Sequence, residues 1–82
     1  MRDIKRIDRI HELIKTIWDK YPDMRYFQLI YNLQRKYSNN SSNYGKIVER
    51  IDKDFEKVGY DFFNLEDDDL IKYLETIVRN GL

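Results

Sequence analysis

The chain has 82 residues, of which 41% are hydrophobic and 15% aromatic, so it is long enough for a single domain and too apolar for a disordered chain. It contains no cysteine, which excludes disulfides, thiolate metal sites and cysteine nucleophiles. Its 15 basic and 15 acidic residues leave no net charge, so the domain lacks the overall positive charge that nucleic-acid-binding domains often carry.

The charge is unevenly distributed along the chain. Residues 1–37 carry nine basic and five acidic residues, a net charge of +4, whereas residues 38–82 carry six and ten, a net charge of −4. We expect the two halves to pair within the chain, with pairing to a second copy or to a charged partner as alternatives.

The sequence also bears on localisation. Charged residues follow Met1 where a signal peptide would be apolar, and no apolar run approaches the 18 or so residues of a membrane span. We therefore expect a soluble cytoplasmic protein without membrane contact.

Two helices are predicted in the first half of the chain. Apolar residues recur every three or four positions from Ile4 to Trp18, which indicates a helix at about residues 4–20, ended by Pro22. The second helix is expected at about residues 23–37, with its first residue as N-cap. Its apolar arc exceeds half of the circumference, so we expect it to be the most buried helix.

A third helix is predicted after the polar turn of residues 38–43. Apolar residues follow an a/d rhythm from Tyr44 to Val58, and Gly59 is well placed to end a helix. The expected bounds of this helix are therefore about residues 44–58.

The fourth helix is predicted at about residues 66–79, with Glu66 as its N-cap and the acidic residues 67–69 at the positive end of the helix dipole. In the connector before it, Phe62 and Phe63 are expected to plug the core, with an exposed binding patch as the alternative. The predicted fold is all-α, a compact bundle of four short helices forming one domain over residues 1–82.

Few residues in the sequence are candidates for catalysis or metal binding. The acidic residues 66–69 lack the glycine and the converging loop of a typical cation site, so we interpret them as a helix start and expect no bound metal. His11 is the only histidine, and no nucleophile–base pair or glycine-rich phosphate loop can be identified. We expect the protein not to be an enzyme and to need no cofactor.

Four basic residues lie along one side of the first predicted helix, and such a strip can contact phosphates. Its members are Arg2, Lys5, Arg6 and Arg9. Because the strip is short and acidic residues interrupt its surroundings, a solvated helix face is the favoured interpretation, and nucleic-acid binding is the alternative.

One set of residues is spread over the first, second and fourth predicted helices and the connector before the fourth. Its members are Trp18, Pro22-Asp23, Arg25, Gln28-Leu29-Ile30, Asn32, Phe62-Phe63 and Glu66-Asp67-Asp68. This set resembles the YihD-like family of small bacterial proteins. It covers residues 2–37 and 61–75 well and residues 38–60 less clearly. The resemblance implies a helical fold and a bacterial or bacteriophage origin, and it implies no activity.

The same motif places Arg25, Gln28 and Asn32 on one polar side of the second helix. Either they form an internal network, with Arg25 reaching a carboxylate of residues 66–68, or they form a recognition strip for a partner. The network is slightly favoured. Among the tyrosines, Tyr31 at the edge of the apolar arc is the one we most expect to be exposed, and it would extend such a strip.

Together these features predict a non-catalytic helical interaction module that binds a protein partner or a second copy of itself. The residues assigned to partner binding are Arg25, Gln28, Tyr31 and Asn32. The alternative is a nucleic-acid-binding accessory protein that uses the basic strip.

Overall fold

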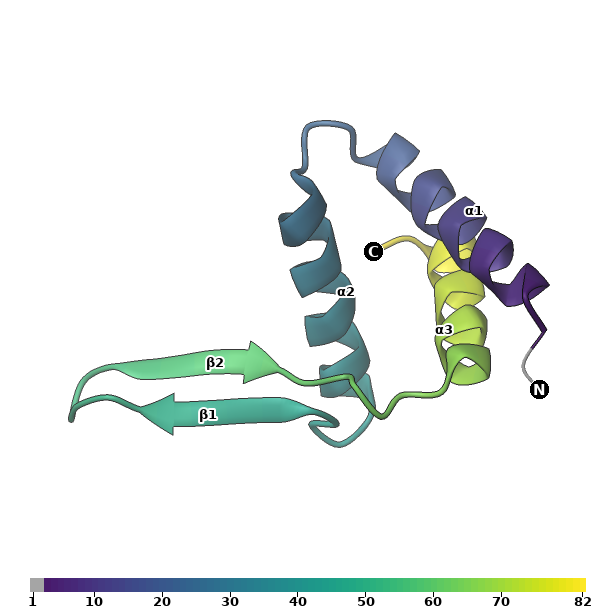
Figure 1. The fold of residues 1–82 in the computed structure, drawn as a ribbon. Helices are drawn as coiled ribbons and strands as arrows, with labels where there is room; N and C mark the ends of the chain where they lie inside the picture. The colour runs from purple at the N-terminus through teal and green to yellow at the C-terminus, as the bar shows by residue number, and fades with distance from the viewer. Residues whose placement is uncertain (1–2) are drawn as a thin grey trace.

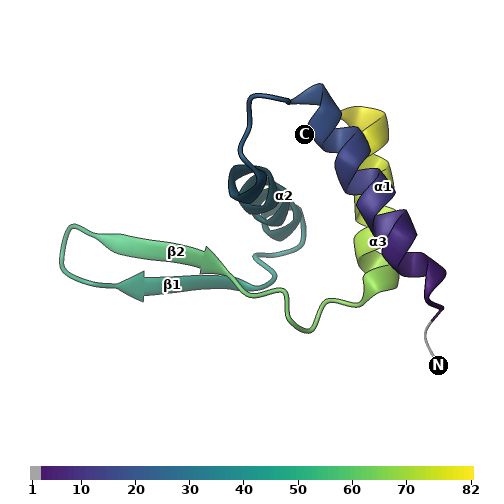
Figure 2. The ribbon, with the colours of Figure 1, turned by 45° about the horizontal axis from the view of Figure 1, so that its top comes forward.

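The structure is a computed structural model, and it describes residues 3–82. The elements follow the order α1 (Lys5–Lys20), α2 (Tyr26–Asn40), β1 (Lys46–Arg50), β2 (Glu56–Tyr60) and α3 (Asp67–Asn80). Figure 1 shows α1 beside α3, α2 standing apart from both, and the two strands projecting from the foot of α2. The turned view in Figure 2 shows the same arrangement.

The predicted all-α bundle of four helices is wrong, because residues 44–58 belong to a β-hairpin and not to a third helix. The backbone before the hairpin has positive φ at Ser42 (56°), Asn43 (63°) and Gly45 (69°). A right-handed helix requires negative φ throughout, so the start of the predicted helix, which includes Gly45, is not helical.

A second turn lies at the far end of the hairpin. The side chain of Asp52 accepts a hydrogen bond from the backbone N–H of Asp54 at 2.8 Å, a local bond that stabilises a turn in place of a helix. The segments on either side contain Ile47, Val48 and Val58, whose branched side chains favour strands. Apolar spacing over so short a segment is compatible with both structures, which is why the helix prediction failed.

We call residues 46–60 the hairpin arm. Its strands are antiparallel, and the register runs from Lys46 opposite Tyr60 to Arg50 opposite Glu56. All five residues of β1 are exposed, so within residues 3–82 the strand is paired with β2 but its side chains are not covered.

The three other predicted helices are present, and one of them is shifted at both ends. α2 begins at Tyr26 and not near residue 23, and it ends at Asn40 and not near residue 37, so it includes the start of the predicted polar turn. Its N-cap is Arg25, whose backbone is extended. The backbone N–H of Arg25 donates to the Gln28 side chain at 2.9 Å, which supplies half of a capping box. The N-cap of α3 is Glu66, as predicted.

The core consists of two buried apolar residues from each helix: Leu13, Ile17, Leu29, Leu33, Leu74 and Ile77. α1 and α3 run in the same direction, because Arg6 meets Asp67 at their starts and Lys20 meets the carbonyl of Val78 near their ends. α2 is joined to this pair by fewer side chains, and this leaves space between them.

Candidate functional site

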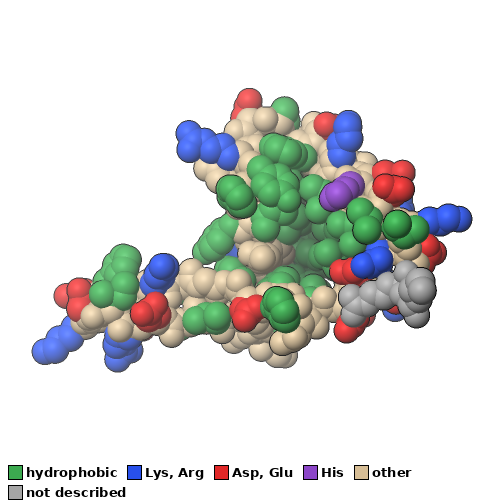
Figure 3. All heavy atoms as spheres, viewed as in Figure 1, with side chains coloured by type: hydrophobic (Ala, Val, Ile, Leu, Met, Phe, Trp, Pro, Cys, Tyr) green, Lys and Arg blue, Asp and Glu red, His purple; other side chains and the backbone are tan. Residues whose placement is uncertain are grey.

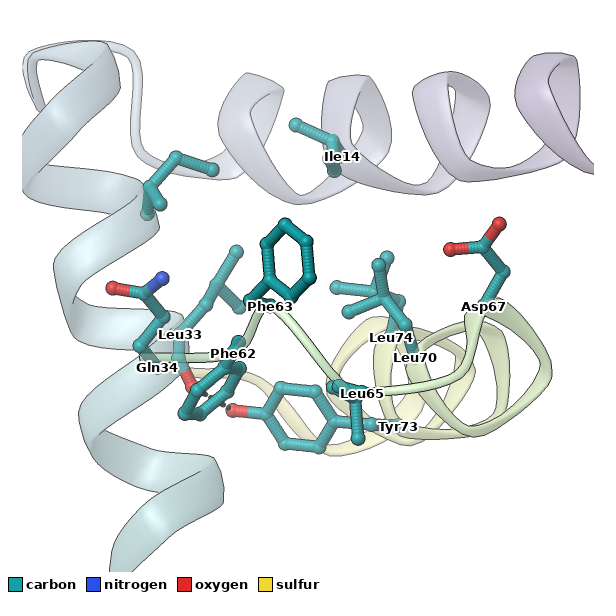
Figure 4. Close-up of a pocket in the computed structure, with 11 residues that line it drawn as sticks. Ile14, Leu33, Gln34, Phe62, Phe63, Leu65, Asp67, Leu70, Tyr73 and Leu74 are labelled. Atoms are coloured by element: carbon teal, nitrogen blue, oxygen red, sulfur yellow. Dashed lines mark hydrogen bonds between the residues drawn. The ribbon is translucent and has the colours of Figure 1, made fainter. Parts of the chain in front are cut away.

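An apolar cleft opens between α2 and the α1–α3 pair, with a volume of about 290 Å³. Figure 3 shows the hollow on one face of the molecule, surrounded by hydrophobic side chains. The connector before α3 crosses its mouth, as Figure 4 shows. The apolar side chains that define the cleft are those of Ile14, Ile30, Leu33, Phe63, Leu70 and Leu74.

Phe63 is the most exposed of these side chains. Its ring is 90% exposed although it lies among the residues lining the cleft. The preceding residue, Phe62, is half-buried and packs against Tyr37 and Tyr44, with ring centroids 5.4 and 5.6 Å apart. The expectation that both phenylalanines plug the core therefore describes Phe62, and the exposed-patch alternative describes Phe63.

The floor of the cleft is fixed by Tyr73. Its hydroxyl donates a hydrogen bond to the backbone carbonyl of Leu33 at 2.7 Å, which ties α3 to α2. Burial raises the pKa of Tyr73 from 10.0 to about 12, since the charged phenolate would lose its hydration there. Tyr73 therefore stays neutral at ordinary pH and acts as a hydrogen-bond donor.

A chain of aromatic rings connects the helices to the hairpin arm. The distance between ring centroids is 5.0 Å for Tyr73 and Tyr37, 6.4 Å for Phe62 and Tyr60, and 5.5 Å for Tyr60 and Tyr31. All three contacts are edge-to-face, the geometry that aromatic quadrupoles favour. The base of the arm is thereby held beside the cleft, whereas its tip projects away from the helices (Figure 1).

The molecule exposes more surface than a compact chain of its mass. Its accessible surface is 6603 Å², whereas about 5,300 Å² is expected for a compact monomer of 10.1 kDa. Its radius of gyration is 14.3 Å, against about 11.7 Å for a compact domain of this length. The open cleft and the projecting arm are the features that account for this excess.

Three of the four residues predicted for partner binding lie together on α2. Gln28, Tyr31 and Asn32 line a shallow hollow with Met24 and Phe27, and Tyr31 and Phe27 are 42% and 80% exposed. Tyr26, at 44%, is slightly more exposed than Tyr31. Gln28 and Asn32 also make internal bonds, the first to the Arg25 backbone and the second to the Met24 sulfur at 3.6 Å.

The fourth residue, Arg25, is exposed and does not line this hollow. Within residues 3–82 it makes no ion pair with Asp67 or Asp68. The carboxylate of Asp67 instead accepts from Arg6 Nε at 2.6 Å. On the polar side of α2, the internal bonds thus run from the Arg25 backbone to Gln28 and from Asn32 to Met24, and they do not link Arg25 to Asp67 or Asp68.

The basic strip is partly neutralised by α3. Arg6 pairs with Asp67, and Arg9 pairs with Glu75 at 3.1 Å. Lys5 is exposed, and Arg2 lies outside the described residues. This is the pairing between the basic and acidic halves that the charge distribution predicted, and it leaves the strip with less positive potential for a phosphate backbone.

Residues for metal or acid–base chemistry do not converge in the part of the chain that the structure describes. Over residues 3–82, no group of three or more histidine, cysteine or acidic side chains is placed to hold a metal ion. His11 is exposed on α1. None of the described helices is long and apolar enough to cross a membrane.

A comparison with protein-family models, curated proteins and solved structures finds no match. The resemblance to the YihD-like family remains a prediction from the residues that carry it.

Sequence reasoning did not find the cleft. Its walls come from three helices, and their placement depends on the divergence of α2, which periodicity cannot give. Two signals pointed to it: the apolar arc of α2 is wider than one neighbour can cover, and Phe63 follows Phe62 where one ring is enough to fill the core.

Proposed function

We propose that this chain is a non-catalytic interaction module and that it binds a protein partner, or a second copy of itself, in the apolar cleft. The observation that carries the proposal is the cleft with the nearly fully exposed ring of Phe63 at its mouth. Exposed apolar surface of this kind is costly in water unless a partner covers it.

The size of the cleft supports a protein partner over a small molecule. Its volume of about 290 Å³ lies just below the range for ligand pockets, about 300–1,000 Å³. Such a space suits one or two large apolar side chains of a partner. Interfaces commonly place aromatic side chains like Phe63 at their centre.

The surface excess supports the same interpretation. A standard interface buries about 800 Å² on each partner, and the excess of about 1,300 Å² over a compact monomer is more than enough to supply it.

The test is photocrosslinking in the host cell, with a benzophenone amino acid at position 63. We expect covalent adducts of defined mass, because the side chain at this position would lie inside the interface. The matched control carries the same amino acid at Lys15, whose side chain is 77% exposed on α1 and does not line the cleft. Equal adduct yield at both positions, or none at position 63, would refute the proposal.

A further inference from the structure

We infer that the partner of the cleft is a second copy of this chain, and that the tip of each hairpin arm, with Ile51 and Phe55, enters the cleft of the other copy. The inference rests on the proposed function, because it names the partner that the cleft accepts.

The first argument is the apolar tip of the arm. Ile51 and Phe55 are 57% and 56% exposed and stand at the two ends of the turn, where the Ile51 N–H donates to the Phe55 carbonyl at 3.1 Å. Neither side chain packs against the hydrophobic core of residues 3–82. A two-stranded hairpin is also marginally stable in water by itself, so the arm gains stability from a surface that covers it.

The second argument is that the two unpartnered surfaces match each other in kind and size. The cleft, with a volume of about 290 Å³, suits one or two large apolar side chains, and the arm tip presents two. Because each copy carries one arm and one cleft, a two-fold axis satisfies all four surfaces and closes the assembly at a dimer.

The third argument is electrostatic. The chain has no net charge, so two copies meet without overall repulsion. The competing dimer, in which the free edges of two β1 strands pair, is disfavoured in its fully overlapped register. Centred on Val48, that register places Lys46 opposite Arg50 twice, and like charges directly opposite are destabilising.

The area is sufficient for such a dimer. The excess of about 1,300 Å² over a compact monomer exceeds the roughly 800 Å² that each partner of a standard interface contributes. A reciprocal exchange would bury the cleft and the tip of the arm, which belong to the two features that make the molecule extended.

Self-association is measured by sedimentation equilibrium over a range of concentrations, with wild type and two pairs of variants. We expect wild type to dimerise, and Phe55→Asp and Phe63→Asp each to weaken dimerisation by more than about tenfold. The matched controls Lys53→Ala and Asn64→Asp change exposed neighbours of these two residues and should dimerise like wild type. Circular dichroism verifies that each variant is folded. Substitutions at exposed positions such as 55 and 63 should leave the fold intact.

The arm-in-cleft geometry is tested by disulfide formation, since the chain has no cysteine of its own. Mixing a Phe55→Cys variant with a Phe63→Cys variant should give the mixed disulfide faster than Phe55→Cys mixed with Lys15→Cys. A wild-type chain that stays monomeric at all concentrations would overturn the inference. So would a dimer indifferent to Phe55→Asp, or equal rates for the two cysteine mixtures.

These results can be separated from the photocrosslinking test. Adducts at position 63 with a different protein, together with a monomeric chain, would refute the second copy as partner and retain the proposed function. Absence of any adduct at position 63 would refute the proposed function itself.

Discussion

In the α1–α3 pair, apolar side chains from both helices are buried and charged side chains meet across the interface, whereas in the hairpin arm every residue of β1 is exposed. The helix pair is stabilised by contacts between distant parts of the chain. The arm depends on its own strand pairing and on the aromatic rings at its base. Mutations should therefore affect the two regions through different interactions and to different extents.

The largest difference should appear when apolar side chains are shortened. Leu74 is fully buried in α3, so Leu74→Ala should lower the free energy of unfolding by about 2–5 kcal/mol through lost burial and a cavity. Val48, which is 51% exposed in the arm, is the matched position, and Val48→Ala should cost less than about 1 kcal/mol. Urea denaturation of the monomer, at low concentration, measures both. Comparable losses would mean that the arm belongs to the core.

A second prediction concerns the glycines at the base and within the arm. Gly45 has a φ of +69°, and an added Cβ would lie 2.5 Å from the carbonyl oxygen of Asp61, so Gly45→Ala should cost about 1–3 kcal/mol. Gly59 has no atom within 4 Å of such a Cβ, so Gly59→Ala should stay within about 0.5 kcal/mol of wild type.

This pair of variants also separates the hairpin from the helix predicted by the apolar spacing. In a helix over residues 44–58, alanine in place of Gly45 would stabilise the protein by about 1 kcal/mol. Thermal unfolding followed by circular dichroism measures the sign, and a stabilised Gly45→Ala variant would contradict the hairpin.

The third prediction is a loss of stability at alkaline pH that originates in Tyr73. Because its pKa is raised from 10.0 to about 12 in the folded protein, the unfolded chain releases this proton first as the pH rises. The stabilisation of the folded protein that comes from neutral Tyr73 is fully present below about pH 10 and is lost between about pH 10 and about pH 12. Unfolding midpoints over this range measure it.

The Tyr73→Phe variant is the control for that titration. It should show a smaller decline over the same pH range, and at neutral pH it should lose about 1–2 kcal/mol with the hydrogen bond to Leu33. An unchanged alkaline decline in the variant would assign the effect to other tyrosines, such as Tyr60, whose partial burial also raises its pKa.

The smallest effects should come from ion pairs. A double-mutant cycle on Arg6 and Asp67, whose side chains are 27% and 33% exposed, should give a coupling energy of about 0.5–1 kcal/mol. The same cycle on Arg50 and Glu56 in the arm, exposed at 75% and 50%, should give less than about 0.5 kcal/mol. The reverse order would contradict the assignment of the stronger pairing to α1 and α3.

The sequence predicts the helical part of the fold because its pattern is long and regular there. The stripe from Ile4 to Trp18 spans four turns, and Glu66 with its acidic successors marks the start of α3. The arm is different, since its apolar residues fit both a helix and a hairpin. The deciding features are the positive φ values at residues 42, 43 and 45, which a sequence of serine, asparagine and glycine permits without requiring.

The candidate site is less predictable than the fold. Gln28, Tyr31 and Asn32 share one side of α2, so their spacing alone brings them together. The cleft is assembled from α1, α2, α3 and a connector, and no local pattern encodes how far α2 diverges. Arg6 and Asp67 illustrate the limit. The basic first half and the acidic second half of the chain predict that such residues attract each other. They do not predict that Asp67 pairs with Arg6 and that Arg25 stays exposed.

The closure of the arm at its base has a consequence for how the chain can vary. The Asp61 N–H donates to the Gly45 carbonyl at 2.8 Å, which joins the two chain segments just outside the Lys46–Tyr60 pair at the base of the arm. The closure entropy of a loop changes slowly with its length. Pairs of residues can therefore be added to or removed from the strands without displacing α2 or α3. A domain inserted at the tip of the arm should accordingly leave the helices folded, while preventing the tip from entering the cleft of a second copy.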